Sequence, residues 1–467
     1  MSMGFDPVVE PPIAMPSVYG PKTQPTQRAP DIDGIVSLKV RDLFPDIPRA
    51  IYHGGRDVAA VRAATEAALA RVDMSMIKAS DSVNILCSEH GFGIMGGFAY
   101  AEMVKTIRDV VEARTGCRNL RLVVIAWLGY KESKEIIEFY GLEDAFQGKV
   151  RSATPFDRGV PIETEIGTLY GVGKVFNSKW IIHTHYDDPR EIYLHRMIDR
   201  VAKPFGMSYA RFETRSIYHS NFGARSGNFI ARAIADSDFV KSRLAFSADL
   251  VSSPDGVVGV DADNVLDDLG NRITYNVLSS YGKMLDLLGR IDECIPVIDG
   301  GKWPYYCHAG GMIFGQFFYS GKDWFDLSTD AETNVYRLLP TAMTKAIKAL
   351  VINQTLVGLG FAGPEFFPTV VASEDMAETM RRDMANPTFM TKAATQPSLA
   401  DAIAWAKDKG GTDKIMFFDG SYGAINLSPS MAARLRELAP ACEAAVAEKL
   451  PRWLKQRGID PARIARH

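Results

Sequence analysis

Four of the eight histidines fall within residues 183–219, and this group is the strongest chemical signal in the sequence. His183 and His185 end an expected strand, where side chains two apart share a face. In α/β sheets, ligands bind at the carboxyl ends of the strands. Imidazoles suit acid–base work near neutral pH or a transition metal. We therefore expect a functional site built from His183, His185, His195 and His219, although any one histidine can be structural.

Two arginines extend this group. If the segment Tyr209–His219 is extended, its side chains point alternately to two faces, which would put Arg211, Arg215 and His219 on the same face. Guanidinium groups bind oxyanions with two parallel hydrogen bonds. Arg211 and Arg215 are thus expected to hold a substrate carboxylate or phosphate, unless they only pair with the acidic residues of 187–191.

Three glycine-rich segments are weaker candidates. Ser88–Gly93, which includes His90 and Gly91, follows a strand and precedes a helix, so its backbone N–H groups suit an anion. The alternative is a turn that uses glycine for its geometry. The loop 300–311 contains Lys302 and His308 and resembles a binding loop. Residues 358–363 match GxGxxG, but a helical-looking run precedes them, which favours a plain loop.

The expected elements alternate along the chain. Helical and strand patterns over residues 55–203 predict strands at Val83–Cys87, Leu120–Trp127 and Lys179–His183, and helices at Gly55–Val72, Tyr100–Arg114, Lys131–Tyr140 and Pro189–Lys203. A second unit includes Cys294–Ile298, helices at Leu338–Val351 and Leu399–Lys409, a strand at Lys414–Phe418 and a helix or helix pair at Met431–Arg457.

This order predicts an α/β fold with two α/β domains, mostly parallel sheets and an interdomain cleft. The expected boundaries are a proline-rich arm over 1–30, a first domain over 31–254, a second over 255–430 and a helical segment over 431–467.

Composition narrows the class of protein. The chain has 467 residues with 46% hydrophobic and 23% charged residues, which is typical of globular domains. A net charge of −3 gives no reason to expect nucleic acid or a membrane surface as partner. Five scattered cysteines without a CxxC pair and no signal peptide favour the cytoplasm. A small-molecule substrate is expected, and the arm would suit a homodimer.

Four segments resemble the nickel-dependent lactate racemase superfamily of 2-hydroxyacid racemases and epimerases. They are Val83–His90, Leu122–Gly141, Gly167–His185 and the matches at 398–406, 413–420 and 428–429. The resemblance covers roughly residues 60–430 by short matches. It implies a two-domain isomerase with a nickel-pincer nucleotide cofactor. That cofactor takes hydride from C2 of the substrate and returns it to either face, while a histidine removes the hydroxyl proton.

The resemblance also implies roles for individual residues. His185 is similar to the family's base, and His219 lies where a nickel ligand is expected. His195 falls at the place of the lysine that carries the cofactor, and Tyr130 or Lys131 replaces the first catalytic histidine. Ser88, His90 and Gly91 lie in the phosphate-holding turn, whose arginine is missing. Without that lysine, the cofactor is bound noncovalently, altered or absent.

Two other classes of function stay open. One is a different enzyme on the same scaffold, such as a metal-assisted hydrolase, a lyase or a hydride-transfer enzyme. The other is a protein that binds an anion or a nickel cofactor without turning it over. Screening 2-hydroxyacids for loss of optical purity, against product release, separates these classes.

Overall fold

The structure is a computed structural model of the whole chain. It describes residues 8, 24–93, 97–126, 129–186, 201–220, 226–300, 323, 325–328, 344–355, 363–382 and 388–464, without the side chains of 90, 93, 219, 226–228, 363 and 463. Most of the expected arm, most of the helix Pro189–Lys203, and the loop 301–311 lie outside these residues.

The first sheet has six strands in the order β4-β3-β2-β7-β8-β9. All neighbours are parallel except the last pair. The strands are β2 (Val83–Ser88), β3 (Leu120–Ile125), β4 (Val150–Ala153), β7 (Trp180–Tyr186), β8 (Leu244–Ser253) and β9 (Gly256–Asp263). Its central strands are buried along their length, as expected for a parallel sheet covered on both faces.

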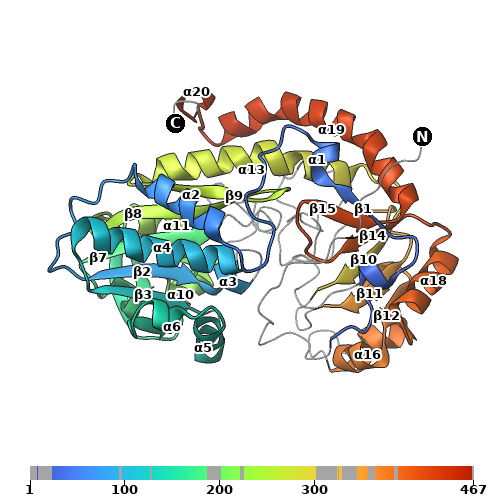
Figure 1. Cartoon of the computed structure of the whole chain (residues 1–467), viewed down its shortest axis with the longest axis horizontal. Helices are drawn as coiled ribbons and strands as arrows, with labels where there is room; N and C mark the ends of the chain where they lie inside the picture. Colours follow the sequence, from blue (N-terminus) through green and yellow to red (C-terminus); the bar gives the residue numbers. More distant parts are fainter. Residues whose placement is uncertain are drawn as a thin grey trace.

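The second sheet has seven strands in the order β1-β15-β14-β10-β11-β12-β13. The neighbouring strands β14, β10, β11, β12 and β13 are parallel to one another. Strand β15 pairs antiparallel with β14, and β1 pairs antiparallel with β15. The strands are β1 (Val36–Lys39), β10 (Ile295–Asp299), β11 (Leu350–Gln354), β12 (Thr369–Ala372), β13 (Ala394–Gln396), β14 (Ile415–Phe418) and β15 (Ala424–Leu427). The fold is thus α/β with two mostly parallel sheets, as predicted (Figure 1).

The sheets divide the chain differently from the expected ranges. Strand β1 comes from the N-terminal part but pairs with β15, in the sheet of the C-terminal half. Strand β9 lies beyond residue 254 but pairs with β8 of the first sheet. A small antiparallel pair, β5 (Gly159–Thr164) and β6 (Gly167–Val172), stands apart from both sheets.

The prediction of a helix over Leu338–Val351 is wrong at its described end. Leu350 and Val351 begin strand β11, which is buried on both faces. A short apolar run of this kind has no periodicity that separates a buried helix from a buried strand. A strand therefore precedes the GxGxxG match, whose residues 358–362 lie outside the described part of the chain.

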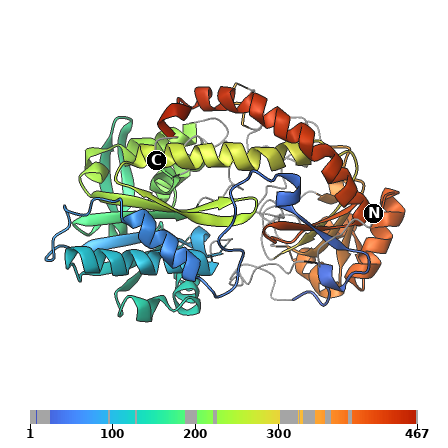
Figure 2. The same cartoon turned by 45° about the horizontal axis from the view of Figure 1, so that its top comes forward.

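Long helices cover the sheets and join them. Figures 1 and 2 show α13 (Leu266–Gly289) and α19 (Pro429–Gln456) running side by side across both halves. Helix α19 is a single helix, with Pro440 and Pro451 inside it. The other helices longer than one turn are α2 (Ala59–Leu69), α3 (Glu89–Gly93), α4 (Gly97–Thr115), α5 (Tyr130–Phe139), α10 (Phe212–Ser220), α11 (Ser226–Ala235), α16 (Glu374–Arg381) and α18 (Leu399–Gly410).

Single turns complete the described helices. They are η1 (Ala29–Asp31), α1 (Val40–Leu43), α6 (Leu142–Ala145), α7 (Gly173–Phe176), α9 (Lys203–Gly206), α12 (Asp238–Lys241), α15 (Gly363–Phe366), α17 (Phe389–Lys392) and α20 (Pro461–Ile464). None of the described helices is long and apolar enough to cross a membrane.

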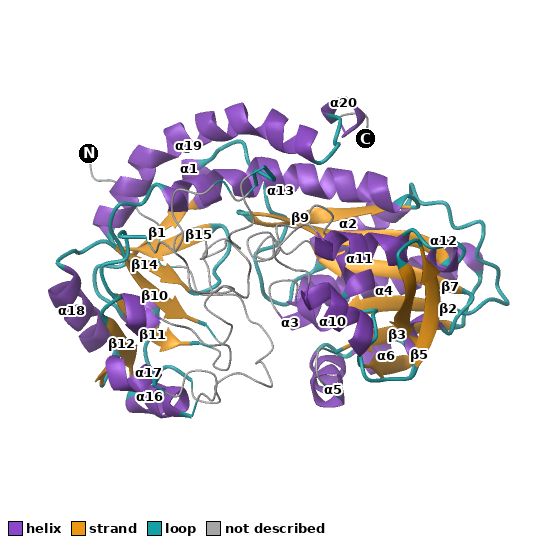
Figure 3. Cartoon of the chain, turned by 180° about the vertical axis from the view of Figure 1, so that it is seen from behind, coloured by secondary structure: helices purple, strands orange, loops and turns teal. Residues whose placement is uncertain are grey.

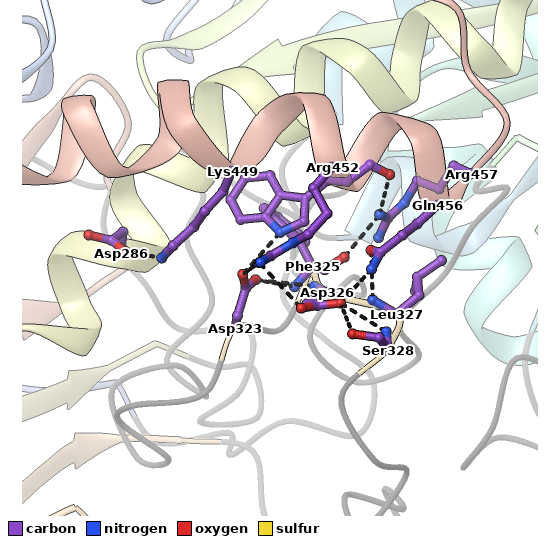
Figure 4. A network of polar contacts seen from close by, with 11 residues as sticks. Asp286, Asp323, Phe325, Asp326, Leu327, Ser328, Lys449, Arg452, Gln456 and Arg457 are labelled. Carbon is purple, nitrogen blue, oxygen red and sulfur yellow. Dashed lines mark hydrogen bonds and ion pairs between the residues drawn. The ribbon is translucent and has the colours of Figure 1, made fainter.

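The C-terminal end of α19 holds the segment 323–328 through polar contacts (Figure 4). Asp323 accepts hydrogen bonds from the Arg452 guanidinium at 2.8 Å and from the Trp453 indole at 3.1 Å. The Gln456 amide donates to Asp326 at 2.6 Å. These contacts fix one end of the long helix to the second half of the chain.

Each sheet has one point where the order of its strands reverses. In the first sheet, β2 has β3 and β4 on one side, whereas β7 lies on its other side. In the second sheet, β10 has β11, β12 and β13 on one side, whereas β14 lies on its other side. The carboxyl ends of both sets of parallel strands point toward the middle of the molecule (Figures 1 and 3). Open α/β sheets bind ligands at such reversal points.

Candidate functional site

His183 lies in β7 at the reversal point of the first sheet, and the protein uses both of its ring nitrogens. Nε2 lies 2.9 Å from the Val201 carbonyl, and Nδ1 lies 2.7 Å from the Tyr209 hydroxyl. A carbonyl only accepts, so Nε2 carries the hydrogen and Nδ1 accepts from the tyrosine. Burial lowers the pKa of His183 to about 4. His183 is therefore a neutral, fully buried residue that stabilises this part of the fold.

His185 lies two residues further along β7, closer to the edge of the sheet. Its ring stacks on that of His183 with centroids 6.1 Å apart, and its side chain is almost fully buried. In the parallel register of β7 and β8, His185 pairs with Asp249. Paired residues on adjacent strands point to the same face, with their backbones about 4.8 Å apart. An imidazole near the carboxyl end of β7 and a carboxylate in the middle of β8 thus lie on neighbouring strands and on the same face of the sheet.

Sequence reasoning missed Asp249, although the sequence contains a signal for it. Asp249 is fully buried within the strand Leu244–Ser253, whose neighbours are largely apolar. A carboxylate is rarely buried in such a strand without a partner or a function. The register that brings it beside His185 depends on β8 pairing with β7, which no local pattern shows.

A second pair of charges lies at the same edge. Glu89 directly follows β2, and Arg215 belongs to α10. Both side chains are buried. Burial lowers the pKa of Arg215 to about 10, and the nearby carboxylate of Glu89 acts in the opposite direction. This places a largely desolvated guanidinium and a carboxylate beside β2, the neighbour of the histidine strand.

The predicted extended segment Tyr209–His219 is wrong, because residues 212–220 form helix α10. The two arginines, four residues apart, differ in burial and contacts. Arg211 precedes the helix, donates to the Asp157 carbonyl at 3.1 Å and pairs with Glu213. Only Arg215 reaches the buried edge of the first sheet.

The turn Ser88–Gly93 also differs from expectation. Ser88 ends β2, and Glu89–Gly93 forms the short helix α3, which begins with an acidic residue. A Cβ at Gly91 would lie 2.3 Å from the ring of Tyr100. Close packing against that ring explains the glycine.

Tyr130 and Lys131 begin α5 and take different positions. Tyr130 is partly exposed, and its hydroxyl donates to Asp157 and accepts from Lys174 at 2.9 Å. Lys131 lies in solvent and contacts Glu135 at 3.8 Å. Tyr130 therefore belongs to a polar cluster beside β4, which β3 and β2 separate from β7.

The remaining predicted site residues are not placed. His195, Lys302 and His308 lie outside the described residues, as do the side chains of His90 and His219. Within the described part of the chain, no three His, Cys, Asp or Glu side chains form a group that could hold a metal ion. The expected interdomain cleft and the metal site stay predictions.

Comparison of the chain with models of known protein families found no family that matches. Comparison with curated proteins found no relative.

Proposed function

We propose that the chain is an isomerase that racemises or epimerises a 2-hydroxyacid, with His185 as the general base. The observation that carries this proposal is the pairing of His185, in a strand at the reversal point of the first sheet, with Asp249 on the neighbouring strand β8. The resemblance of the sequence to 2-hydroxyacid racemases supplies the substrate class.

The chemistry of the pair suits proton transfer. A carboxylate beside an imidazole orients the ring, selects its tautomer and stabilises the charged form that appears when the ring takes a proton. His183, neutral and fixed by two hydrogen bonds, packs against the other side of the ring. His185 would take the proton from the substrate hydroxyl and return it, while the hydride of C2 would pass to, and back from, a bound acceptor of the kind that the resemblance implies.

Arg215 would bind the substrate carboxylate. A desolvated guanidinium binds an oxyanion more strongly than an exposed one, and it offers two parallel donors. The nearby carboxylate of Glu89 favours the charged form of this guanidinium. Arg211, which already contacts Asp157 and Glu213, is not needed for this role.

The side chains that the resemblance assigns to the nickel-pincer nucleotide, at positions 195 and 219, lie outside the described residues. No group of three metal-ligating side chains occurs among them, and histidine stands at 195 where the resemblance expects the anchoring lysine. We therefore derive no step through that cofactor, and the proposal concerns the proton that His185 handles.

We also propose a cytoplasmic location. The described cysteines Cys87, Cys117, Cys294 and Cys442 are free and buried, as is usual in a reducing compartment.

The test is loss of optical purity in a panel of single-enantiomer 2-hydroxyacids. The protein would come from a host that co-expresses nickel-pincer synthesis enzymes, and the metal content of each preparation would be measured. His185→Gln should lower the rate by about 10²–10⁴-fold, as expected when a general base is removed. His53→Gln, a mostly exposed histidine, is the matched control and should keep the wild-type rate. An H185Q variant with the wild-type rate would overturn the proposal.

A further inference from the structure

The second sheet carries a buried acidic pair at its own reversal point. Asp299 ends β10, and Asp419 directly follows β14, the strand beside it. Their side chains are 1% and 6% exposed. Because β10 and β14 are the strands between which the order reverses, these carboxyl groups lie where open α/β sheets bind ligands.

The oxygens of the two carboxyl groups differ in their hydrogen bonds. Asp419 accepts from the Ser421 backbone N–H at 2.9 Å and from the Asn426 amide at 2.8 Å, one on each oxygen. Asp299 Oδ1 accepts from the Asn353 amide at 2.9 Å and faces the Arg28 guanidinium at 3.4 Å. Asp299 Oδ2 has no hydrogen-bond partner among the described residues. A buried oxygen in this state has lost its hydrogen bonds to water without replacement, so it calls for an explanation.

The negative charge of Asp299 and Asp419 is also not fully balanced by the described residues. Among the described residues, one cation contacts this pair: Arg28, which is partly exposed and reaches one oxygen of Asp299. Burial, helped by Asp419, raises the pKa of Asp299 to about 7 against the opposing effects of Arg28 and Asn353. At neutral pH the site therefore lacks about one positive charge, which a proton or a bound cation can supply.

We propose that this reversal point is a second binding site, at which Asp299 Oδ2 accepts a hydrogen bond from the ammonium or guanidinium group of a small organic cation. Two independent observations carry it: the position at the reversal point and the buried oxygen without a partner. The site is separate from the proposed function at His185.

The donor set favours an organic cation over a metal ion. Hard metal ions need about six to eight oxygen ligands, and no group of three metal-ligating side chains occurs among the described residues. An ammonium or guanidinium group supplies its own N–H donors and needs only acceptors in suitable positions. Asp299 Oδ2 is such an acceptor, and the negative charge of Asp419 strengthens the attraction.

Isothermal titration calorimetry of the full chain at pH 8 tests the proposal. The probes are 1,4-diaminobutane and agmatine, its guanidinium analogue, with uncharged 1,4-butanediol and magnesium chloride as comparisons. The cations should bind and butanediol should not. Binding should weaken as the pH falls below 7, because a proton then competes for Asp299.

Variants locate the binding. Asp299→Asn should weaken it at least tenfold, whereas Asp408→Asn, on the exposed side of α18, should leave it unchanged. Arg28→Ala removes the cation that shares Asp299 and should tighten binding, which keeps the test valid if the first variant does not fold. Absence of binding in both the wild type and Arg28→Ala, unchanged binding in Asp299→Asn, or Asp299-dependent binding of magnesium alone would overturn the proposal.

Discussion

The two sheets place buried carboxyl groups at equivalent points but surround them differently. In the first sheet, Asp249 lies beside an imidazole, and Glu89 acts on a buried guanidinium. In the second, Asp299 and Asp419 lie together, and Arg28 faces one oxygen from 3.4 Å. An imidazole and a guanidinium thus lie beside carboxyl groups in the first sheet, and two carboxyl groups lie together in the second. The same topology can serve proton transfer at one edge and cation binding at the other, depending on side chains alone.

Among variants that distinguish the two reversal points, Asp249→Asn should have the largest effect, on the rate of racemisation. Asp249→Asn keeps the size of the side chain but removes the charge that would stabilise protonated His185. We expect the racemisation rate to fall about 10²–10⁴-fold, with the acidic limb of the pH–rate profile shifted down, because the imidazole loses affinity for its proton. Asp299→Asn should leave that profile in place. A D249N profile identical to that of the wild type would contradict the pairing.

The charge pair at the first edge should matter for stability. Arg215→Ala leaves Glu89 buried without the guanidinium and should cost about 3–5 kcal/mol in free energy of unfolding, measured with denaturant. Lys131→Ala removes an exposed lysine with one contact to Glu135 and should change stability by less than about 0.5 kcal/mol. Equal effects of the two variants would show that Arg215 is not in a buried pair.

At the reversal point of the second sheet, Asp299 should make the stability of the protein depend on pH. A carboxyl whose folded-state pKa is raised to about 7 favours folding in its protonated form. That stability is present below the unfolded-state pKa of about 4 and is lost as the pH rises to about 7. Relative to Asp299→Asn, the wild type should therefore lose up to a few kcal/mol between pH 4 and pH 8. Parallel stability curves for the two proteins would exclude the raised pKa.

The smallest effect concerns the turn that follows β2. Gly91→Ala would push a methyl group into the ring of Tyr100 and should destabilise the protein by about 1–3 kcal/mol in thermal or denaturant unfolding. The matched variant Gly129→Ala has open space around the new methyl group and should cost no more than about 1 kcal/mol. A tolerated alanine at 91 would point to a reason other than packing for that glycine.

Local patterns predict the parts of this fold that depend on local physics. Strands such as Val83–Ser88 and Leu120–Ile125 are mostly apolar, and α18 has a serine cap and a following glycine. The alternating pattern predicts the wrong structure for residues 212–220, which form a helix. This helix buries Thr214, Arg215 and Tyr218, and an alternating strand would not bury both Thr214 and Arg215 on one face. The partnership of His185 with Asp249 depends on strand order, which only the tertiary structure sets.

The central claim is that His185 and Asp249 act as one unit, and a double-mutant cycle tests it most directly. The rate of loss of optical purity would be measured for the wild type, His185→Gln, Asp249→Asn and the double variant, with equal metal content confirmed in each. We predict that the double variant is no slower than His185→Gln alone, because the carboxylate acts through the imidazole. Losses that multiply, as for two independent sites, would contradict the claim.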